Sequence, residues 1–566
     1  MTKKLNLTLC WHMHQPYYRK GLNGEYQLPW VYLHGIKDYD DMAAHLERHP
    51  HMKAVVNFTP VLLEQLTDYA EQIRAFLDKG DSMDDSMLSM LAGATPIPDN
   101  AKGRRELIQA CRRAHAPRMI DPWPQFHGLL QMFPLDEQPG GQEILVSYLD
   151  DQYFVDLLVW YHLAWCSHRL KQTPAVRRLM ERAKRYTMED RHQLLEIIRE
   201  TLESIIPRYR KLAESGQVEI SMTPWGHPIV PLLNDFGNMK ESQPDAPMPE
   251  HPGYPGGLER SRWHLQHGME RFERFFGFRP KGIWLSEGGI SDDAIALLDE
   301  MGIQWTASGE AVWHHSCLTS ACNPDEMACR KALFIPYRLQ ERQTLVYFRD
   351  DGLSDLIGFE YSKWHADDAV ADFMGHLHRI ASSLGDEADQ HVVSIILDGE
   401  NAWEYYPDNG HYFLDALYRA IENSDFINSV TFSEAGDLTR RDTLSHLVAG
   451  SWVYGSFSTW IGSPDKNRAW DLLVDVKKVF DRKIDSMDEA KAEQARRMLA
   501  ICEGSDWFWW FGDYNPSDSV NDFDRLFRTQ LKTLYCMLDE TPPASLDTPV
   551  SSGGGYMENA GTMRRN

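Results

Sequence analysis

Seven short apolar segments, most of them followed by a helical pattern, constrain the fold of this chain more than any other feature of its sequence. The segments are residues 5–11, 53–58, 218–222, 282–285, 304–307, 344–348 and 392–397. This alternation is typical of β/α units with parallel strands. A ring of such strands presents its functional groups where the strands end. We therefore expect an α/β barrel and look for chemistry at the strand ends.

The chain is long enough for more than one domain. Its 566 residues exceed the roughly 250–300 residues at which a single core usually stops growing. Residues 61–215 are mostly helical and predict an insertion into a barrel domain of residues 1–430. The alternation then stops, so residues 431–540 predict a C-terminal helical domain. The Gly- and Pro-rich residues 541–566 predict a disordered tail.

Charge and cysteine content exclude several classes of protein. A formal charge of −25 opposes binding to nucleic acid or to an anionic membrane surface. The sequence has no apolar run of about 18 residues that could span a membrane and no recognisable export signal at its start, so we expect a cytoplasmic protein. Its eight cysteines are too sparse for a disulfide framework. Cys317, Cys322 and Cys329 match no zinc-site spacing, and we interpret them as thiols.

Two predicted strands end in carboxylates. Glu287 follows an apolar strand in "GIWLSEGGIS" and precedes two glycines, which allow a sharp turn and close approach of a ligand. In "VVSIILDGENAWEYY", a strand buried on both faces is followed by Asp398, Glu400 and Glu404. Such a cluster is costly unless it is paired or used. The spacing alone leaves both Asp398 and Glu400 as candidate proton donors.

Histidines and aromatic residues form a second group of candidates. His12 and His14 in "LCWHMHQPYY" could either bind a metal or hold a polyhydroxyl substrate, and His227 lies in the turn "WGHP". In "GSDWFWWFGDY", Asp506 precedes a run of aromatic residues that begins at Trp507. Aromatic planes stack on sugar rings, and a carboxylate accepts hydrogen bonds from hydroxyls. These residues therefore favour a carbohydrate substrate.

Two carboxylates flanking a bond, with stacking and hydrogen-bonding groups around them, are what glycoside hydrolysis requires. A dehydrogenase is disfavoured because no Gly-rich dinucleotide loop follows the first strand.

Five motifs spread over nearly the whole chain resemble those of glycoside hydrolase family 57. They are "HMHQP", "WGHP", "WLSE", "LDGENAWE" and "SDWFWW", in this order. The resemblance implies an incomplete (β/α)7 barrel with a helical domain that completes the cleft. It also implies a retaining enzyme acting on α-glucans or maltooligosaccharides, with no metal or other cofactor. The family usually has Pro or Ala where this sequence has Ser286, which weakens assignment to one activity within the family.

The resemblance also implies residue roles. Glu287 is expected to be the nucleophile and Asp398 the general acid/base, a choice over Glu400 that comes from the family pattern alone. The expected substrate contacts are His12, His14, His227, Trp284, Trp403, Asp506 and Trp507.

The expected reaction is α-amylase- or pullulanase-like hydrolysis. The expected linkages are α-1,4 and, for a pullulanase-like enzyme, also α-1,6. A 4-α-glucanotransferase or a branching enzyme is the alternative within the family. Two alternatives from other classes stay open. One is a zinc-dependent deacetylase- or mannosidase-like enzyme, with His12, His14 and His227 as ligands. The other is a glycan-binding protein without catalysis.

Overall fold

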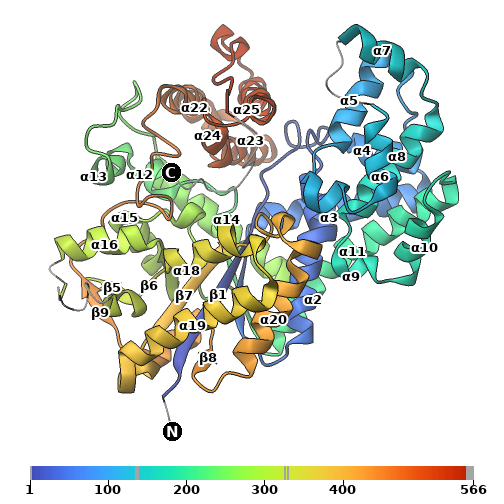
Figure 1. The fold of residues 1–566 in the computed structure, drawn as a ribbon. Coiled ribbons are helices and arrows are strands. Elements are labelled where there is room, and N and C mark those ends of the chain that lie inside the picture. Colours follow the sequence, from blue (N-terminus) through green and yellow to red (C-terminus); the bar gives the residue numbers. More distant parts are fainter. Residues whose placement is uncertain are drawn as a thin grey trace.

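The computed structural model describes residues 3–133, 139–320, 322, 323, 325, 327 and 330–555. Its centre is a group of parallel strands covered by helices, with two further helical groups outside it (Figure 1). Among the described helices, none is long and apolar enough to cross a membrane.

Parallel strands form a continuous ring. Six of the predicted segments are strands: β1 (Leu5–Met13), β2 (Ala54–Phe58), β3 (Val218–Met222), β4 (Trp305–Ser308), β6 (Leu345–Phe348) and β7 (Val392–Asp398). Neighbours pair in the order β3-β2-β1-β7 and β4-β6. The predicted segment 282–285 makes bridges at Ile283 and Gly282 that join β3 to β4, and Arg349 bridges to Ser394 of β7. These links close the ring and confirm the predicted (β/α)7 barrel.

Burial of the strands explains why their sequences are runs of apolar residues. All residues of β1 and β2 are buried, as expected where helices cover a parallel sheet. Three further strands were not predicted, because three residues are too few to show a pattern. They are β5 (Tyr337–Leu339), which is antiparallel to β6, β8 (Ile427–Ser429), which pairs with the start of β1, and β9 (Asp442–Leu444), which pairs with β5.

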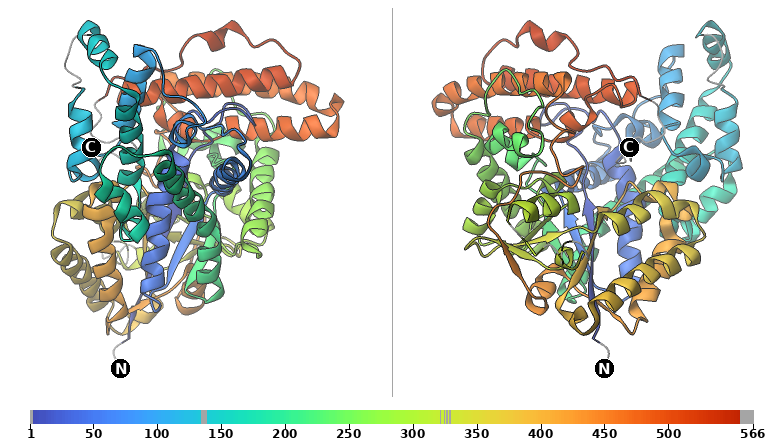
Figure 2. Two further views of the ribbon diagram at one scale, coloured as in Figure 1. Left: turned by 90° about the vertical axis from the view of Figure 1, so that its right-hand side faces the viewer. Right: turned by 60° about the vertical axis from the view of Figure 1, so that its left-hand side comes forward.

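The helices between the strands mostly cover the ring on its outside (Figures 1 and 2). They are α1 (Trp30–His34), α2 (Asp40–Arg48), α12 (Val230–Asn234), α13 (Met239–Ser242), α14 (Gly257–Phe276), α15 (Asp292–Glu300), α16 (Glu310–Thr319), α18 (Asp351–Asp355), α19 (Ala366–Leu384), α20 (His411–Glu422) and α21 (Phe432–Leu438).

Residues 60–214 form the helices of the stretch predicted to be an insertion. They gather on one side of the barrel, at the upper right of Figure 1. The helices are α3 (Pro60–Lys79), α4 (Ser86–Ala92), α5 (Ala101–Cys111), α6 (Pro124–Gln131), α7 (Pro139–Ser147), α8 (Asp151–Trp165), α9 (His168–Lys171), α10 (Pro174–Arg182) and α11 (Met188–Glu214).

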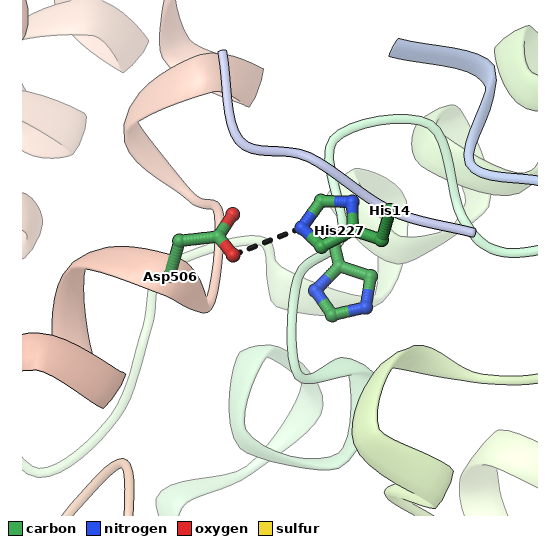
Figure 3. Close-up of side chains that lie close together, drawn as sticks. All are labelled: His14, His227 and Asp506. Carbon is green, nitrogen blue, oxygen red and sulfur yellow. Dashed lines mark hydrogen bonds and ion pairs between the residues drawn. The ribbon is translucent and has the colours of Figure 1, made fainter. Parts of the chain in front are cut away.

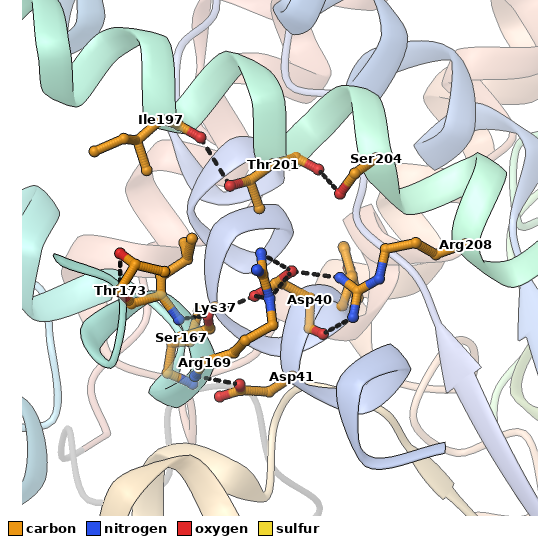
Figure 4. A network of polar contacts seen from close by, with 12 residues as sticks. Lys37, Asp40, Asp41, Ser167, Arg169, Thr173, Ile197, Thr201, Ser204 and Arg208 are labelled. Atoms are coloured by element: carbon orange, nitrogen blue, oxygen red, sulfur yellow. Dashed lines mark hydrogen bonds and ion pairs between the residues drawn. The ribbon is translucent and has the colours of Figure 1, made fainter. Parts of the chain in front are cut away.

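A buried carboxylate joins these helices to the barrel. Asp40, at the start of α2, has a fully buried side chain and pairs with Arg169 of α9 and Arg208 of α11 (Figure 4). The Ser167 hydroxyl donates to the same carboxylate at 2.5 Å, and the neighbouring Asp41 accepts from the backbone N–H of Arg169 at 3.0 Å. One short helix of the barrel therefore holds two segments of the insertion.

The last helices lie across the end of the barrel at which the strands end (Figures 1 and 2). They are α22 (Pro464–Lys483), α23 (Glu489–Cys502), α24 (Asp506–Trp510) and α25 (Ser517–Met537).

The start of the predicted disordered tail is ordered in the structure. Val550 and Ser551 are buried, and the Val550 backbone N–H donates to Asp524 of α25 at 2.6 Å. The prediction was therefore wrong for this stretch, because a polar composition does not reveal that a buried aspartate offers backbone partners. Residues 556–566 of the predicted tail lie outside the described residues.

Candidate active site

Three neighbouring strands end side by side with polar residues. His12 of β1 is in register with Asn57 of β2 and with Asp398 of β7. The His12 ring Nδ1 and the Asn57 side-chain oxygen lie 2.7 Å apart, and the Asn57 amide donates to the Ser221 hydroxyl of β3 at 2.9 Å. The ring of strands thus provides a polar floor at one end of the barrel.

Glu287 lies in a tight turn with a backbone that a residue with a side chain rarely adopts. Its φ of 60° and ψ of 22° are left-handed, which costs of order 1–2 kcal/mol for a residue other than glycine. Gly288 follows with φ of 59°, and a Cβ on it would come within 2.8 Å of the Trp284 ring. Such strain tends to cluster at functional sites.

Trp452 fixes the Glu287 side chain and was not predicted as a site residue. Its indole N–H donates to Glu287 Oε2 at 2.9 Å, and its backbone N–H donates to the Glu287 carbonyl at 3.1 Å. The residue belongs to the loop after β9, in the stretch "GSWVYG". No sequence pattern distinguishes this tryptophan from the others.

The Glu287 and Asp398 carboxyls interact. Burial and, to a smaller extent, the negative charge of Asp398 together raise the pKa of Glu287 to about 8, against the opposing effect of the Trp452 N–H. Burial also raises the pKa of Asp398, against a hydrogen bond at 3.0 Å from the Asn401 amide and the charges of His14 and Arg349. The pair therefore retains a proton at neutral pH, as acid catalysis by one carboxyl and attack by the other require.

Glu400, the alternative to Asp398, has a different environment. Its side chain is buried, and its Oε1 accepts the backbone N–H of His14 at 3.1 Å and more distant contacts from Gln15 and Tyr39. Asp398 is partly exposed. A carboxyl that must reach a substrate needs that exposure, so the structure favours Asp398.

The three predicted histidines form one stack. The rings of His14 and His227 lie nearly parallel, with centroids 3.7 Å apart (Figure 3). The centroid of the His12 ring lies 5.3 Å from that of His227. His14 Nε2 contacts Asp506 Oδ1 at 2.9 Å, and its Nδ1 contacts the Thr59 hydroxyl at 3.0 Å. Burial lowers the pKa of His12 to about 3 and also lowers the pKa of His227. These two rings are therefore neutral.

Residues of the C-terminal helices complete the stack. The Ser505 hydroxyl lies 2.8 Å from His227 Nδ1, and the Ser505 backbone N–H donates to the His227 carbonyl at 2.9 Å. His227 itself has a left-handed φ of 59°. Asp506 and His14 remain partly exposed, as do Glu287 and Asp398, so these four polar side chains are accessible from outside the protein.

The stack does not have the ring orientation of a metal site, although ligand atoms of His14, His227 and Asp506 lie within 4.8 Å of one another. An imidazole binds a metal through a lone pair in the plane of its ring, at about 2.0–2.1 Å for zinc. Two rings that are 13° from parallel and stacked face to face cannot both direct lone pairs at one ion. The arrangement favours hydrogen bonding to a substrate.

Three predicted substrate contacts are packed inside the protein. Trp403 is fully buried beside Trp11, and its indole N–H donates to the Gly399 carbonyl at 2.9 Å. Trp507 is also buried and donates to the Ile501 carbonyl, while Trp284 packs on Trp452. Dense aromatic runs usually belong to a core, and here these side chains pack in the core next to the site.

Arg349 was also missed from the sequence. Its buried guanidinium pairs with Asp351 and Asp355, donates to the Ile396 carbonyl at 2.8 Å and lies 5.6 Å from the centre of the Trp452 ring. It therefore connects β6, β7 and the tryptophan that contacts Glu287. Its position directly after a predicted strand, residues 344–348, is the sequence signal that could have identified it as a site residue.

An α/β barrel with two interacting, partly exposed carboxyls and a stack of histidines at its strand ends is typical of a carbohydrate-active enzyme. Residues 8–446 match the sequence model of glycosyl hydrolase family 57. The chain belongs to this family, and it is a glycoside hydrolase or transferase. A comparison with curated protein sequences gives no match.

Solved structures with the same fold include three enzymes. The branching enzyme of family 57 from Thermococcus kodakaraensis is 16% identical, with a TM-score of 0.57 over 94% of this chain and 90% of that one. The branching enzyme from Pyrococcus horikoshii is 17% identical, with a TM-score of 0.55 over 98% and 97%. The α-amylase from Thermotoga maritima is 13% identical, with a TM-score of 0.57 over 95% and 93%. At these identities the likeness establishes the fold.

Proposed function

We propose that this chain is an α-glucan-active enzyme that acts with retention of configuration and primarily hydrolyses its substrate. The observation that carries the proposal is the electrostatically coupled pair of partly exposed carboxyls, Glu287 and Asp398, at the strand ends. Membership of family 57 supports an α-glucan as the substrate, since the similar structures include an α-amylase.

In the first step, Asp398 donates its proton to the leaving glycosidic oxygen while Glu287 attacks the anomeric carbon. Trp452 binds Glu287 Oε2, which leaves Oε1 to attack. The positive charge that develops on the sugar ring favours ionised Glu287, so the proton of the pair lies on Asp398 when the substrate is bound. In the second step, Asp398 takes a proton from a water molecule whose oxygen attacks the anomeric carbon, and the bond between that carbon and Glu287 breaks, which frees the ionised carboxylate.

The imidazole stack and Asp506 would bind the sugar ring at the reacting bond. The buried His227 Nε2 has no hydrogen-bond partner among the described residues, and such a group is costly unless a ligand satisfies it. A sugar hydroxyl can do so. The partly exposed Asp506, whose Oδ1 contacts His14, can accept a further hydrogen bond from a neighbouring sugar hydroxyl at Oδ2.

Transfer to a sugar acceptor is the second candidate function, because an acceptor hydroxyl can replace water in the second step. Two of the similar structures are branching enzymes, which supports this candidate. A further similar structure, with a TM-score of 0.51, is the 4-α-glucanotransferase from Thermococcus litoralis.

Product analysis of Glu287→Gln beside the wild type tests the proposal. The substrates are amylose, pullulan and maltoheptaose, and the products are separated by chromatography. Wild type should produce shorter reducing sugars. The variant should lose roughly 10⁴-fold or more in kcat, the range for removal of a nucleophile.

Ser286→Ala is the matched control, because the Ser286 hydroxyl is buried and has no hydrogen-bond partner among the described residues. This variant should keep wild-type turnover. Longer oligosaccharides from wild type would establish transfer instead of hydrolysis. Wild-type turnover by Glu287→Gln would contradict the proposal.

A further inference from the structure

A fully buried carboxylate, Glu503, lies next to the site but takes no part in the proposed reaction. It follows α23 and accepts hydrogen bonds from three side chains of the barrel domain. These are the Tyr254 hydroxyl at 2.6 Å, the Arg260 guanidinium at 2.8–3.1 Å and His264 Nε2 at 2.8 Å. Burial by itself would raise the pKa of Glu503, but Arg260 and His264 lower it to about 2. Glu503 is therefore ionised at working pH.

The contact with Glu503 determines the tautomer of His264. A carboxylate only accepts hydrogen bonds, so Nε2 of His264 must carry the proton. Burial lowers the pKa of this histidine, against the contact with Glu503, and the ring is neutral because its Nδ1 accepts a hydrogen bond. Its Nδ1 is then a free acceptor, and the backbone N–H of Gly226 donates to it at 3.2 Å. Glu503 thus acts through His264 on the backbone next to His227.

The turn that receives this contact is tightly enclosed. A Cβ on Gly226 would lie 2.9 Å from the Ala500 carbonyl of α23 and 3.1 Å from the His264 ring. The next residue, His227, has the left-handed φ of 59° and contacts Ser505 through its backbone and its ring. The strained turn is therefore held from one side by Glu503 and His264 and from the other by Ser505.

We propose that Glu503 and His264 are positioning residues, which hold the Gly226–His227 turn so that the His227 ring stays in the imidazole stack. Neither residue touches the substrate. The proposal rests on the proposed function only for its effect on turnover, because the conformation of the turn can be observed without any substrate.

Two substitutions of His264 separate positioning from stability. His264→Leu removes both hydrogen bonds of the ring and leaves the Arg260–Glu503 pair in place. His264→Gln keeps a donor for Glu503 and an acceptor for Gly226. His162→Leu is the control, because His162 is an equally buried neutral histidine in α8 whose partners are Tyr32 and the Leu158 carbonyl.

Each variant is measured for kcat, KM and thermal unfolding, and a crystal structure of each is determined. His264→Leu should lose roughly 10- to 100-fold in kcat/KM, the range for removal of a group that orients a ligand-binding side chain. His264→Gln should recover most of that loss. His162→Leu should lower the unfolding temperature but keep kcat/KM.

In the crystal structure of His264→Leu, residue 227 should leave the left-handed region or lose its contact with Ser505. An unchanged turn in that structure would overturn the proposal, and so would wild-type kcat/KM. If His264→Leu does not fold, His264→Gln provides the test. A His264→Gln variant that is active and keeps the turn supports the proposal. A variant that keeps the turn but is inactive overturns it. Absence of any α-glucan activity in the wild type would refute the proposed function, while the crystal structures would still decide the positioning role.

Discussion

Two residues with left-handed backbones, Glu287 and His227, lie at the centre of the candidate site. Each is held by a donor that is distant in the chain, the Trp452 indole N–H for Glu287 and the Ser505 backbone N–H for His227. The sequence identified both residues as functional candidates because each is next to a glycine in a predicted turn. It did not identify the residues that hold them, because those contacts are distant in the sequence.

Trp452→Phe tests the electrostatics of Glu287. Loss of the indole N–H removes a stabilising contact of the ionised carboxylate, so the pKa of Glu287 should rise above its present value of about 8. The nucleophile would then hold the proton more often, and kcat/KM should fall roughly 10- to 100-fold, the range for a hydrogen bond to a charged group. The alkaline limb of the pH profile of kcat/KM should move to higher pH. An unchanged limb would show that this contact does not control the pair.

At the scale of elements, strand ends and a short helix bring the site residues together. β1 brings His12 beside Asp398, and α24 brings Asp506 to His14. The periodic pattern of the sequence was sufficient to find β1 and β7, since their residues are apolar and buried. It missed β5, β8 and β9, which are three residues each. Such short strands depend on pairing with neighbours more than on their own composition.

Asp40→Asn tests how α2 holds the insertion. The substitution leaves the guanidinium groups of Arg169 and Arg208 without their buried carboxylate. Breaking a buried ion pair in this way should lower the free energy of unfolding by about 3 kcal/mol. Urea unfolding measures the change.

The matched control for Asp40→Asn is Glu300→Gln. Its pair with Arg262 is at a similar distance but is largely exposed. The expected loss there is below about 1 kcal/mol. Equal losses in the two variants would contradict the role of Asp40.

At the scale of the whole molecule, the C-terminal helices are part of the site and of the core. The hydrophobic core continues from the strands into α22–α25, and Phe508 stacks on Trp470 with ring centroids 4.2 Å apart. Glu503 adds a buried ion pair with Arg260 of α14. The predicted helical domain is thus bound to the barrel by apolar and charged contacts.

A chain that ends at Gly462 should not fold cooperatively. It would lack Glu503, leaving the buried Arg260 unpaired, and would expose the apolar surface that α22–α25 cover. Size-exclusion chromatography and near-ultraviolet circular dichroism should show an aggregated chain without fixed aromatic packing. A chain that ends at residue 555 is the control and should unfold like the full protein. A folded, monomeric chain ending at Gly462 would contradict this expectation.

The sequence by itself determined the seven segments that form the barrel ring and the candidate residues for the chemistry. Apolar runs, glycine turns and the polar residues that end a strand are local patterns, so Glu287, the Asp398–Glu400 cluster and the three histidines could be found from them, while the choice of Asp398 came from the family resemblance. Only the tertiary structure decided which residues meet. His14 and Asp506 are 492 positions apart and form a contact of 2.9 Å. Trp452, Ser505 and Glu503 act through contacts of the same long-range kind, which depend on how the helices pack and on no local pattern.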